Sequence, residues 1–368
     1  MEKYYLAALA SVLGYAAPRK VFMLANYFGS AREAYEAPLP EVFASGIIQG
    51  KLQSYYCSHW QKSLPNLLAE YCANNKVQII SLKETHYPQA LKTISVPPVV
   101  LYVKGQLPQG SNYLAIVGSR KASSYGLRAA EEFAAKLALE NMTVVSGGAK
   151  GIDASAHKGA LKVKGSTIAV LGSGIDLLYP AINSKIFAAI LENGAIVSEF
   201  APGVKPLPQN FPMRNRIIVG LCRGVLVVEA AQKSGAMITA DIALEENREV
   251  YCLPGNIYSA TSKGTNGLIK EGAMLVDAPE EILEDYGLLL KERKPVKIEK
   301  ANLFSNLSNK QTAQADLVLA MLTPGEVVTL EEIVTKTELA LSIVSGILLD
   351  LQISGLVRQQ PGQRYMRV

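Results

Sequence analysis

The spacing of hydrophobic residues changes along the chain, and its first part has the spacing of helices. Up to about residue 72, apolar positions recur every three or four residues, interrupted at Gly14, Pro18 and Gly29. Helices are therefore expected at residues 4–13, 19–28, 31–36 and 54–72. The turn at 13–20 has the small residues of a helix-hairpin-helix turn, but Ala16 stands where a second glycine would be expected. Residues 1–72 are thus predicted to be a small all-helical, SAM-like or helix-hairpin-helix-like module, with packing as its favoured role.

Short β-rich runs alternate with helical stretches in the next region, residues 76–290. The runs are 77–81, 99–103, 113–117, 143–146, 167–171, 195–198, 225–228, 249–253 and 274–276. Several are apolar throughout, which is typical of strands buried on both faces of a parallel sheet. The pattern predicts a doubly wound, mostly parallel, Rossmann-like α/β domain.

The remainder of the chain is expected to be a linker, residues 291–308, and a winged-helix domain, residues 309–368. The linker is charged and broken by proline. Thr329 and Glu332 have the capping-box spacing that begins a helix, and a second helix is expected at 342–353, followed by a hairpin. That second helix carries Asp350 and no lysine or arginine, whereas the wing carries Arg358, Arg364 and Arg367. Duplex binding and protein docking therefore both remain open for this domain.

Composition permits a nucleic-acid partner and disfavours metal or membrane chemistry. The net charge of +5 over 368 residues allows a polyanionic partner without requiring one. The four cysteines are scattered and only three histidines are present, so neither disulfides nor a metal site is expected. No apolar stretch approaches the ~20 residues that span a bilayer, and Glu2 offsets Lys3 before the first apolar run. We expect a cytoplasmic protein with no membrane partner.

Three loops after predicted strands combine glycine with hydroxyl groups and cations. Their candidate phosphate-binding residues are Gly118, Ser119, Arg120 and Ser123 after the 113–117 run, Gly147, Gly148 and Lys150 after 143–146, and Gly172 and Gly174 after 167–171. Ligands of open parallel sheets bind beyond the carboxyl ends of the strands, where helix N-termini attract anions. The loops therefore predict a phosphate-binding rim.

The rim lacks the sequence pattern of a dinucleotide site. Gly172 and Gly174 match the first two glycines of that fingerprint, but Leu177 replaces the third. The second strand ends in Ser146 rather than in an acidic residue that would hold a ribose. No cofactor is expected.

The segment 205–216 supplies cations and one aromatic ring. Its candidate ligands for single-stranded DNA are Lys205, Asn210, Phe211, Arg214, Asn215 and Arg216. Single-strand binders pair cations, which follow the phosphates, with aromatic faces on which bases stack. The alternative interpretation buries Phe211 in the core and pairs the arginines with Glu199 or Glu229. Beside the glycine loops the ligand interpretation is favoured, and Lys233, Ser234 and Lys263 are further candidate phosphate contacts.

Catalytic candidates are few. Asp153 and His157 are one helical turn apart and could form an acid–base couple, although a helix-start aspartate packed near a histidine has the same spacing. We expect no catalytic residues. The main alternative is a nucleotide-cleaving, phosphoribohydrolase-like enzyme on the same fold, but the loop 146–151 lacks that family's threonine and glutamate. A metabolite-sensing regulator is a third interpretation, which would require sequence-specific duplex binding.

Taken in order, these motifs resemble the DNA-processing protein A family, also called DprA or Smf. The matching stretches are AIVGSR at 115–120, SGGAKGID at 146–153 with Ala156 and His157, LGSG at 171–174 with Tyr179 and Pro180, FPMRNRII at 211–218 and SGAMITA at 234–240. The resemblance covers residues 76–285. It implies a homodimer formed through the α/β domain that binds and protects incoming single-stranded DNA and loads the RecA recombinase in natural transformation. It also implies that Arg120 and Lys150 bind phosphate and that Phe211 lies against a base, beside the basic Arg214–Arg216 run.

Overall fold

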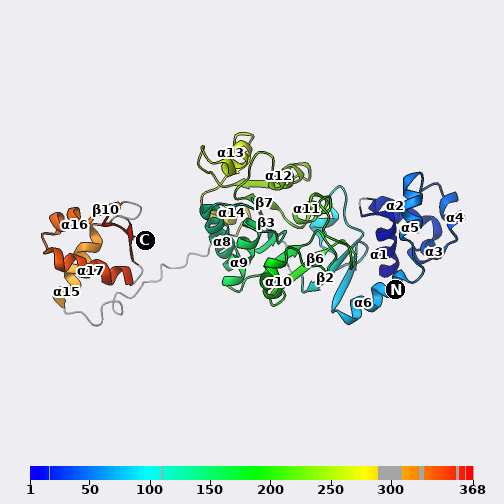
Figure 1. Cartoon of the computed structure of the whole chain (residues 1–368), viewed down its shortest axis with the longest axis horizontal. Coiled ribbons are helices and arrows are strands. Elements are labelled where there is room, and N and C mark those ends of the chain that lie inside the picture. The colour runs from blue at the N-terminus through cyan, green and yellow to red at the C-terminus, as the bar shows by residue number, and fades with distance from the viewer. Residues whose placement is uncertain are drawn as a thin grey trace. The chain divides into compact units, whose positions relative to one another are not determined.

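The computed structural model divides the chain into two compact units, Met1–Leu290 and Lys291–Val368, which we describe separately (Figure 1). It describes residues 1–15, 17–108, 110, 112–288, 309–322, 327–353, 356–360 and 362–367. Ala16 and the expected linker, residues 291–308, lie outside the described residues.

Six described helices form the start of the first unit. They are α1 (Glu2–Leu13), α2 (Pro18–Phe28), α3 (Ala31–Glu36), α4 (Leu39–Ala44), α5 (Lys51–His59) and α6 (Leu64–Asn74). The single helix expected at 54–72 is two helices, because the chain turns at Trp60 and restarts with Pro65 in the first turn of α6. The Trp60 ring stacks on Tyr35 with centroids 5.9 Å apart, and its Nε1 donates to the Tyr35 carbonyl, which anchors the turn.

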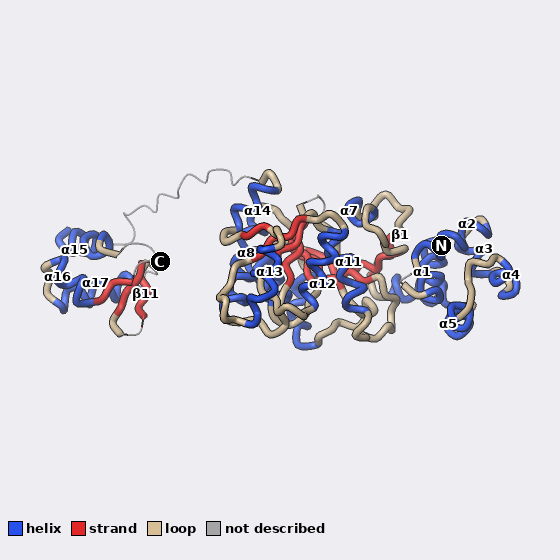
Figure 2. Tube along the Cα trace, turned by 90° about the horizontal axis from the view of Figure 1, so that it is seen from above, coloured by secondary structure: helices blue, strands red, loops and turns tan. Residues whose placement is uncertain are grey.

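The strands of the first unit form a nine-stranded sheet in the order β1-β2-β6-β5-β4-β3-β7-β8-β9. Figure 2 shows the strands in red, with helices in blue around them. Their bounds are β1 (Val77–Ser81), β2 (Val100–Gly105), β3 (Tyr113–Val117), β4 (Thr143–Ser146), β5 (Thr167–Val170), β6 (Gly194–Ser198), β7 (Gly224–Val227), β8 (Glu249–Cys252) and β9 (Met274–Leu275). Along the sheet, the seven neighbouring strands β6, β5, β4, β3, β7, β8 and β9 are parallel. Strand β2 runs antiparallel to both of its neighbours, β1 and β6. The predicted doubly wound, mostly parallel sheet is confirmed, and the chain order reverses direction between β3 and β7.

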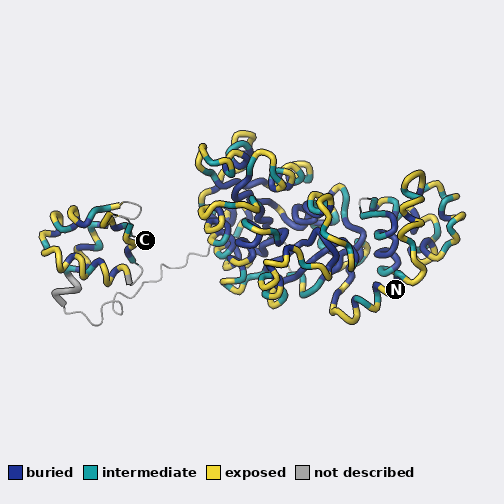
Figure 3. The backbone as a smooth tube through the Cα atoms, in the orientation of Figure 1, coloured by how far each residue is buried: buried dark blue, intermediate teal, exposed yellow. Residues whose placement is uncertain are grey.

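Helices cover both faces of the sheet, and the strands between them are largely buried, apart from the edge strand β9 (Figure 3). One face packs on α8 (Ser124–Leu139), α9 (Ile152–Lys162) and α14 (Pro279–Asp285). The other face packs on α7 (Gln89–Lys92), α11 (Asn210–Leu221), α12 (Gly235–Glu245) and α13 (Lys263–Lys270). The remaining helix, α10 (Ser184–Ile190), shares a core with the N-terminal helices and with β1 and β2. This double cover explains why central strands such as β3 and β7 are apolar throughout.

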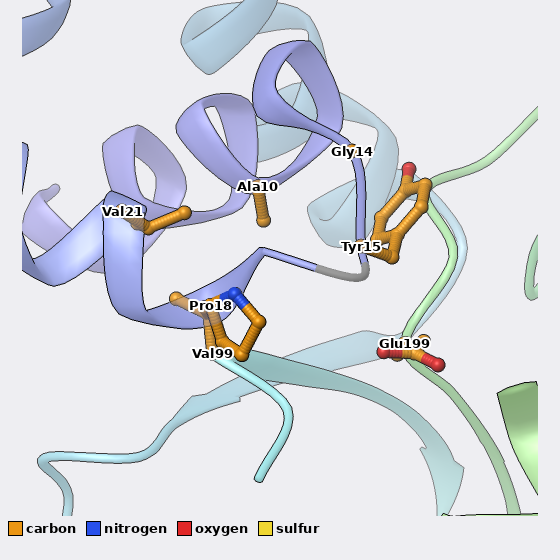
Figure 4. A pocket seen from close by; sticks show the side chains of 7 residues that line it. All are labelled: Ala10, Gly14, Tyr15, Pro18, Val21, Val99 and Glu199. Atoms are coloured by element: carbon orange, nitrogen blue, oxygen red, sulfur yellow. The ribbon is translucent and has the colours of Figure 1, made fainter. Parts of the chain in front are cut away.

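The N-terminal helices are joined to the sheet by a continuous core. Tyr15 packs edge-on against Phe200 with ring centroids 4.9 Å apart, and its hydroxyl accepts a hydrogen bond from the Ala201 amide at 3.0 Å. A cavity of about 10 Å³, no larger than one water molecule needs, lies between the α1–α2 turn and the sheet, with Glu199 on the sheet side (Figure 4). Its lining residues are Ala10, Gly14, Tyr15, Pro18, Val21, Val99 and Glu199. The helical module is therefore packed onto the α/β domain at the end of β6.

The second unit is a winged helix, as predicted. Its elements are α15 (Asn309–Ala320), β10 (Val327–Thr329), α16 (Leu330–Thr337), α17 (Leu341–Ile353), β11 (Val357–Gln360) and β12 (Arg364–Arg367), with strand order β10-β12-β11. The capping box is present, because the Glu332 amide donates to Thr329 Oγ1 and the Thr329 amide donates to Glu332 Oε2. The short strand β10 was not predicted, and its last residue, Thr329, is itself this cap. The sequence Pro361-Gly362 predicts the turn of the hairpin, but Pro361 lies outside the described residues.

Candidate nucleic-acid interface

The loops after β3 and β4 touch one another at the carboxyl edge of the sheet. Gly151 adopts φ +80°, and a Cβ atom there would lie 2.2 Å from the Ser119 carbonyl oxygen, so only glycine fits this contact. The Ile152 amide donates to the same carbonyl at 3.3 Å. Arg120 and Lys150 are both exposed on these two loops. The structure thus brings together the two cations that the sequence singled out.

Phe211, Arg120 and Tyr179 form a cluster at the same edge, which we call the rim cluster. The Arg120 guanidinium carbon lies 5.2 Å from the centroid of the Phe211 ring. A Cβ atom on Gly172 would lie 2.8 Å from Phe211 Cδ1, so the ring rests on the backbone that follows β5. Tyr179, from the same β5–α10 segment, has its ring centroid 5.9 Å from that of Phe211. The loops after β3, β5 and β6 therefore meet around one aromatic ring.

Arg214 has a structural position, in contrast to its predicted role as a DNA ligand. Arg214 is only 4% exposed. Its guanidinium donates to the Gly147 carbonyl at 2.8 Å and, through a short contact, to the Val170 carbonyl. Arg214 lies three residues beyond Phe211 on α11, so its Cα is about 4.5 Å further along the helix axis. Burial lowers the pKa of Arg214 to about 10, although nearby Asp153 counteracts this effect.

Asp153 and His157 do not form an acid–base couple. Asp153 Oδ2 accepts hydrogen bonds from the Gly147 and Ala149 amides at 3.1 and 3.3 Å, and burial raises the pKa of its carboxyl while Arg214 lowers it. His157 Nδ1 lies 2.7 Å from Thr167 Oγ1, which itself donates to a carbonyl, so Nδ1 is assigned as the donor. Burial lowers the pKa of His157 to about 3. Both side chains hold loops and strands in place.

Arg216 pairs with Glu199, as the alternative interpretation had it. The contact is short, and the two side chains are 11% and 3% exposed. Burial raises the pKa of Glu199 to about 7, against the lowering effect of Arg216. The ion pair fixes α11 to the end of β6. Arg216 is therefore not placed to contact DNA.

The two asparagines of the segment 205–216 are also internal. Asn210 Nδ2 donates to the Lys205 carbonyl at 3.2 Å, and Asn215 Nδ2 donates to Thr239 Oγ1 at 3.0 Å. Both residues are less than a tenth exposed. Of the six candidates in this segment, the exposed Lys205 and the half-buried Phe211 remain at the surface.

Glu229 occupies the switch point of the sheet, a feature that the sequence analysis missed. Its carboxylate accepts hydrogen bonds from the Ser123 amide (2.8 Å), from Ser123 Oγ (2.6 Å) and from Thr261 Oγ1 (3.3 Å). A Cβ atom on Gly126 would lie 2.5 Å from this carboxylate. Ser123 thus binds Glu229 and caps α8, in contrast to its predicted contact with phosphate. The helix N-terminus that holds phosphate in dinucleotide-binding folds is filled here by the protein's own carboxylate.

The remaining candidate glycines pack against the protein itself. A Cβ atom on Gly118, Gly147, Gly148 or Gly174 would lie 2.5 to 2.6 Å from other protein atoms. Their lack of a side chain is therefore required for packing, whichever ligand binds above them. The glycines do mark places where other atoms come close to the backbone, as the sequence predicts. Those atoms belong to the protein itself and not to a ligand.

Lys233, Ser234 and Lys263 lie further along the same edge, after β7 and β8. Strand β8 lies four strand spacings from β5 in the sheet, a distance of roughly 19 Å. Both lysines are exposed, and the Gly264 amide donates to the Ala230 carbonyl at 2.8 Å, which ties the two segments together. Ser234 Oγ is buried, with no hydrogen-bond partner among the described atoms. These residues form a second group, on the far side of Glu229 from the rim cluster.

Within the described ranges, no three histidine, cysteine, aspartate or glutamate residues are grouped so that they could hold a metal ion. Nor is any described helix both long and apolar enough to cross a bilayer. Of the cysteines, Cys57 is exposed, whereas Cys72, Cys222 and Cys252 are buried free thiols.

Comparison with known proteins agrees with the order of the motifs. Residues 78–287 match the family model described as DNA recombination-mediator protein A, and residues 306–363 match that of the DprA winged helix domain. The chain is 40% identical over 311 residues to Protein Smf of Escherichia coli K12, covering 83% of this chain and 82% of that protein.

Two solved structures are also similar. DNA processing protein A from Streptococcus pneumoniae has a TM-score of 0.65 and 33% identity, over 77% of this chain and 98% of that one. The second is DNA processing protein A from Helicobacter pylori, in a structure concerned with its single-stranded DNA binding mode. It has a TM-score of 0.51 and 30% identity, over 57% of this chain and 95% of that one. With its motifs, fold and both domain matches in agreement, this chain belongs to the DNA-processing protein A (DprA/Smf) family.

Proposed function

We propose that this protein binds single-stranded DNA along the carboxyl edge of its sheet. The observation that carries the proposal is the rim cluster, in which the exposed cation of Arg120 stands 5.2 Å from the ring of Phe211. Cations of this kind follow phosphates, while aromatic rings stack on bases. Lys150 on the touching loop and Lys205 before α11 add positive charge along the same edge. The Helicobacter pylori relative, whose structure concerns single-stranded DNA binding, supports the same ligand.

The protein carries out no bond chemistry in this proposal. Its internal carboxylates and imidazole already have protein partners: Asp153 holds the β4–α9 loop, Glu199 holds Arg216, and His157 holds Thr167. A nucleotide-cleaving, phosphoribohydrolase-like enzyme would need a threonine and a glutamate on the loop 146–151, which lacks them. The start of α8, another helix N-terminus at this edge, is occupied by Glu229. The phosphoribohydrolase-like alternative is therefore the less supported one.

The family suggests the wider role. We propose that the protein works in the cytoplasm, protects incoming single-stranded DNA and loads a RecA recombinase in natural transformation. The description of the matching family as a recombination mediator supports this role. We also propose a homodimer formed through the α/β domain, and the edge strand β9 exposes Met274 and Leu275 by 41% and 45%, as a pairing edge would. Light scattering with and without an oligonucleotide tests the dimer, and a monomer in both samples would contradict it.

Fluorescence anisotropy with an unstructured oligonucleotide across a salt series tests the DNA proposal. Arg120→Ala and Lys150→Ala are each expected to weaken binding and to reduce the salt slope by about 0.7, the value for one phosphate contact on a single strand. Lys162→Ala is the matched control, because Lys162 carries the same charge at the opposite end of α9. Affinities and slopes that do not differ between the three variants and the wild type would contradict the proposed site.

A further inference from the structure

Tyr179 is an exposed aromatic residue in the rim cluster, and the proposed function gives it no role. Its residue is 49% exposed, and Leu177 and Ile182 in the same segment are 36% and 73% exposed. Phe211, in contrast, is partly covered by Arg120 and by the Gly172 backbone. Tyr179 therefore presents the more open ring of the two.

The segment that carries Tyr179 is held between the two loops that carry the proposed phosphate contacts. Asn183 Nδ2 donates to the carbonyls of Gly148 and Ala149 at 2.9 and 3.1 Å, next to Lys150. Asp176 accepts hydrogen bonds from the Gly203 amide at 2.9 and 3.0 Å, close to Lys205. Pro180 is buried directly after Tyr179. The ring is thus placed on a fixed segment, which lowers the entropic cost of binding to it.

The geometry of the two rings shows how many bases they can receive. A base held between two rings needs parallel planes about 6.8 Å apart, twice the 3.4 Å stacking distance. The rings of Tyr179 and Phe211 are 5.9 Å apart and inclined by 44°. They cannot enclose one base between them, so each ring offers a separate surface.

We propose that Tyr179 is a second stacking surface of the single-stranded DNA site, receiving the base next to the one at Phe211. This proposal rests on the proposed function and extends it: the rim reads two successive unpaired bases by their faces, without selecting their identity. Bases paired in a duplex are stacked on their neighbours, so this arrangement favours single strands over duplexes.

Binding of oligothymidylate to wild type, Tyr179→Ala and Tyr179→Phe tests the proposal. Loss of one stacked base is expected to weaken binding about 5- to 150-fold in Tyr179→Ala. Tyr179→Phe is expected to bind as the wild type does, because it keeps the ring. The salt slope should be unchanged in both, since no phosphate contact is lost. Tyr27→Ala is the matched control, because Tyr27 is 62% exposed on α2, in the N-terminal helical module.

An oligonucleotide series with one abasic site at successive positions completes the test. At one position the abasic site should weaken binding to the wild type but not further weaken binding to Tyr179→Ala, because both changes remove the same contact. If the abasic site weakens binding equally in the two proteins at every position, the proposal is overturned. It is also overturned if Tyr179→Ala binds as the wild type does while Phe211→Ala binds more weakly. In both cases the proposed function survives. Absence of binding by the wild type would refute the proposed function itself. If Tyr179→Ala does not fold, Tyr179→Leu takes its place, since it keeps apolar volume without a ring.

Discussion

Replacing Arg214 with methionine separates a residue that holds the binding loops from one that touches DNA. The change keeps most of the side-chain volume but removes the donors to the Gly147 and Val170 carbonyls and the positive charge near Asp153. Breaking a buried charge pair by removing one partner typically costs about 3–5 kcal/mol. For a unit of this size that corresponds to a fall in melting temperature of roughly 6–20 °C. Arg120→Ala, at an exposed position, should change stability by no more than about 0.5 kcal/mol.

Differential scanning calorimetry of the whole chain, combined with anisotropy on an oligonucleotide, measures both quantities. Arg214→Met is expected to lower the melting temperature of the first unit and also to weaken DNA binding, because the β4–α9 loop loses its support. Arg120→Ala is expected to weaken binding at an unchanged melting temperature. An Arg214→Met protein that melts with the wild type but binds as weakly as Arg120→Ala would refute this reasoning and restore the direct contact expected from the sequence.

Three further changes test other parts of the structure. Gly172→Ala should displace the Phe211 ring, because the new Cβ atom would lie 2.8 Å from it. An anisotropy titration should then show lower affinity for single-stranded DNA. Gly267→Ala is the control, because a Cβ atom at Gly267 would have no other atom within 4 Å. Glu229→Gln should lower the free energy of unfolding in urea by about 1–3 kcal/mol, since the Ser123 donors lose a charged acceptor. Burial lowers the pKa of His157 from 6.5 to about 3, so its stabilising contribution is present above pH 6.5 and is lost as the pH falls towards 3. His157→Gln should flatten that part of the acid unfolding curve, and identical curves for both proteins would exclude this role.

The fold could be predicted because its determinants are local. Uniformly apolar runs such as Tyr113–Val117 indicate strands covered on both sides, and glycines and prolines mark where they end. The helix break near Trp60 was missed because the residues on both sides keep helical spacing. The contact that makes the break, stacking of Trp60 on Tyr35, joins residues that are distant in sequence.

The site could be predicted only in part, for a related reason. Arg120 and Phe211 meet as expected, since the carboxyl ends of parallel strands share one edge. Arg214 has the same residue type and the same basic neighbourhood as a DNA ligand, and only the distant carbonyls of Gly147 and Val170 reveal that it is internal. Glu229 was likewise ambiguous, because its role depends on Ser123, on a neighbouring strand's loop. Sequence proximity indicates which residues gather at an edge, but not which of them face inward.

Photocrosslinking tests the central claim most directly. An oligonucleotide containing 5-iodouracil is irradiated with the whole protein, and the crosslinked peptides are identified by mass spectrometry. Crosslinks are expected in the peptides that contain Phe211 and Tyr179, and Arg120→Ala should reduce them. Crosslinks confined to the N-terminal helices or to the winged helix, with none at this edge of the sheet, would contradict the claim.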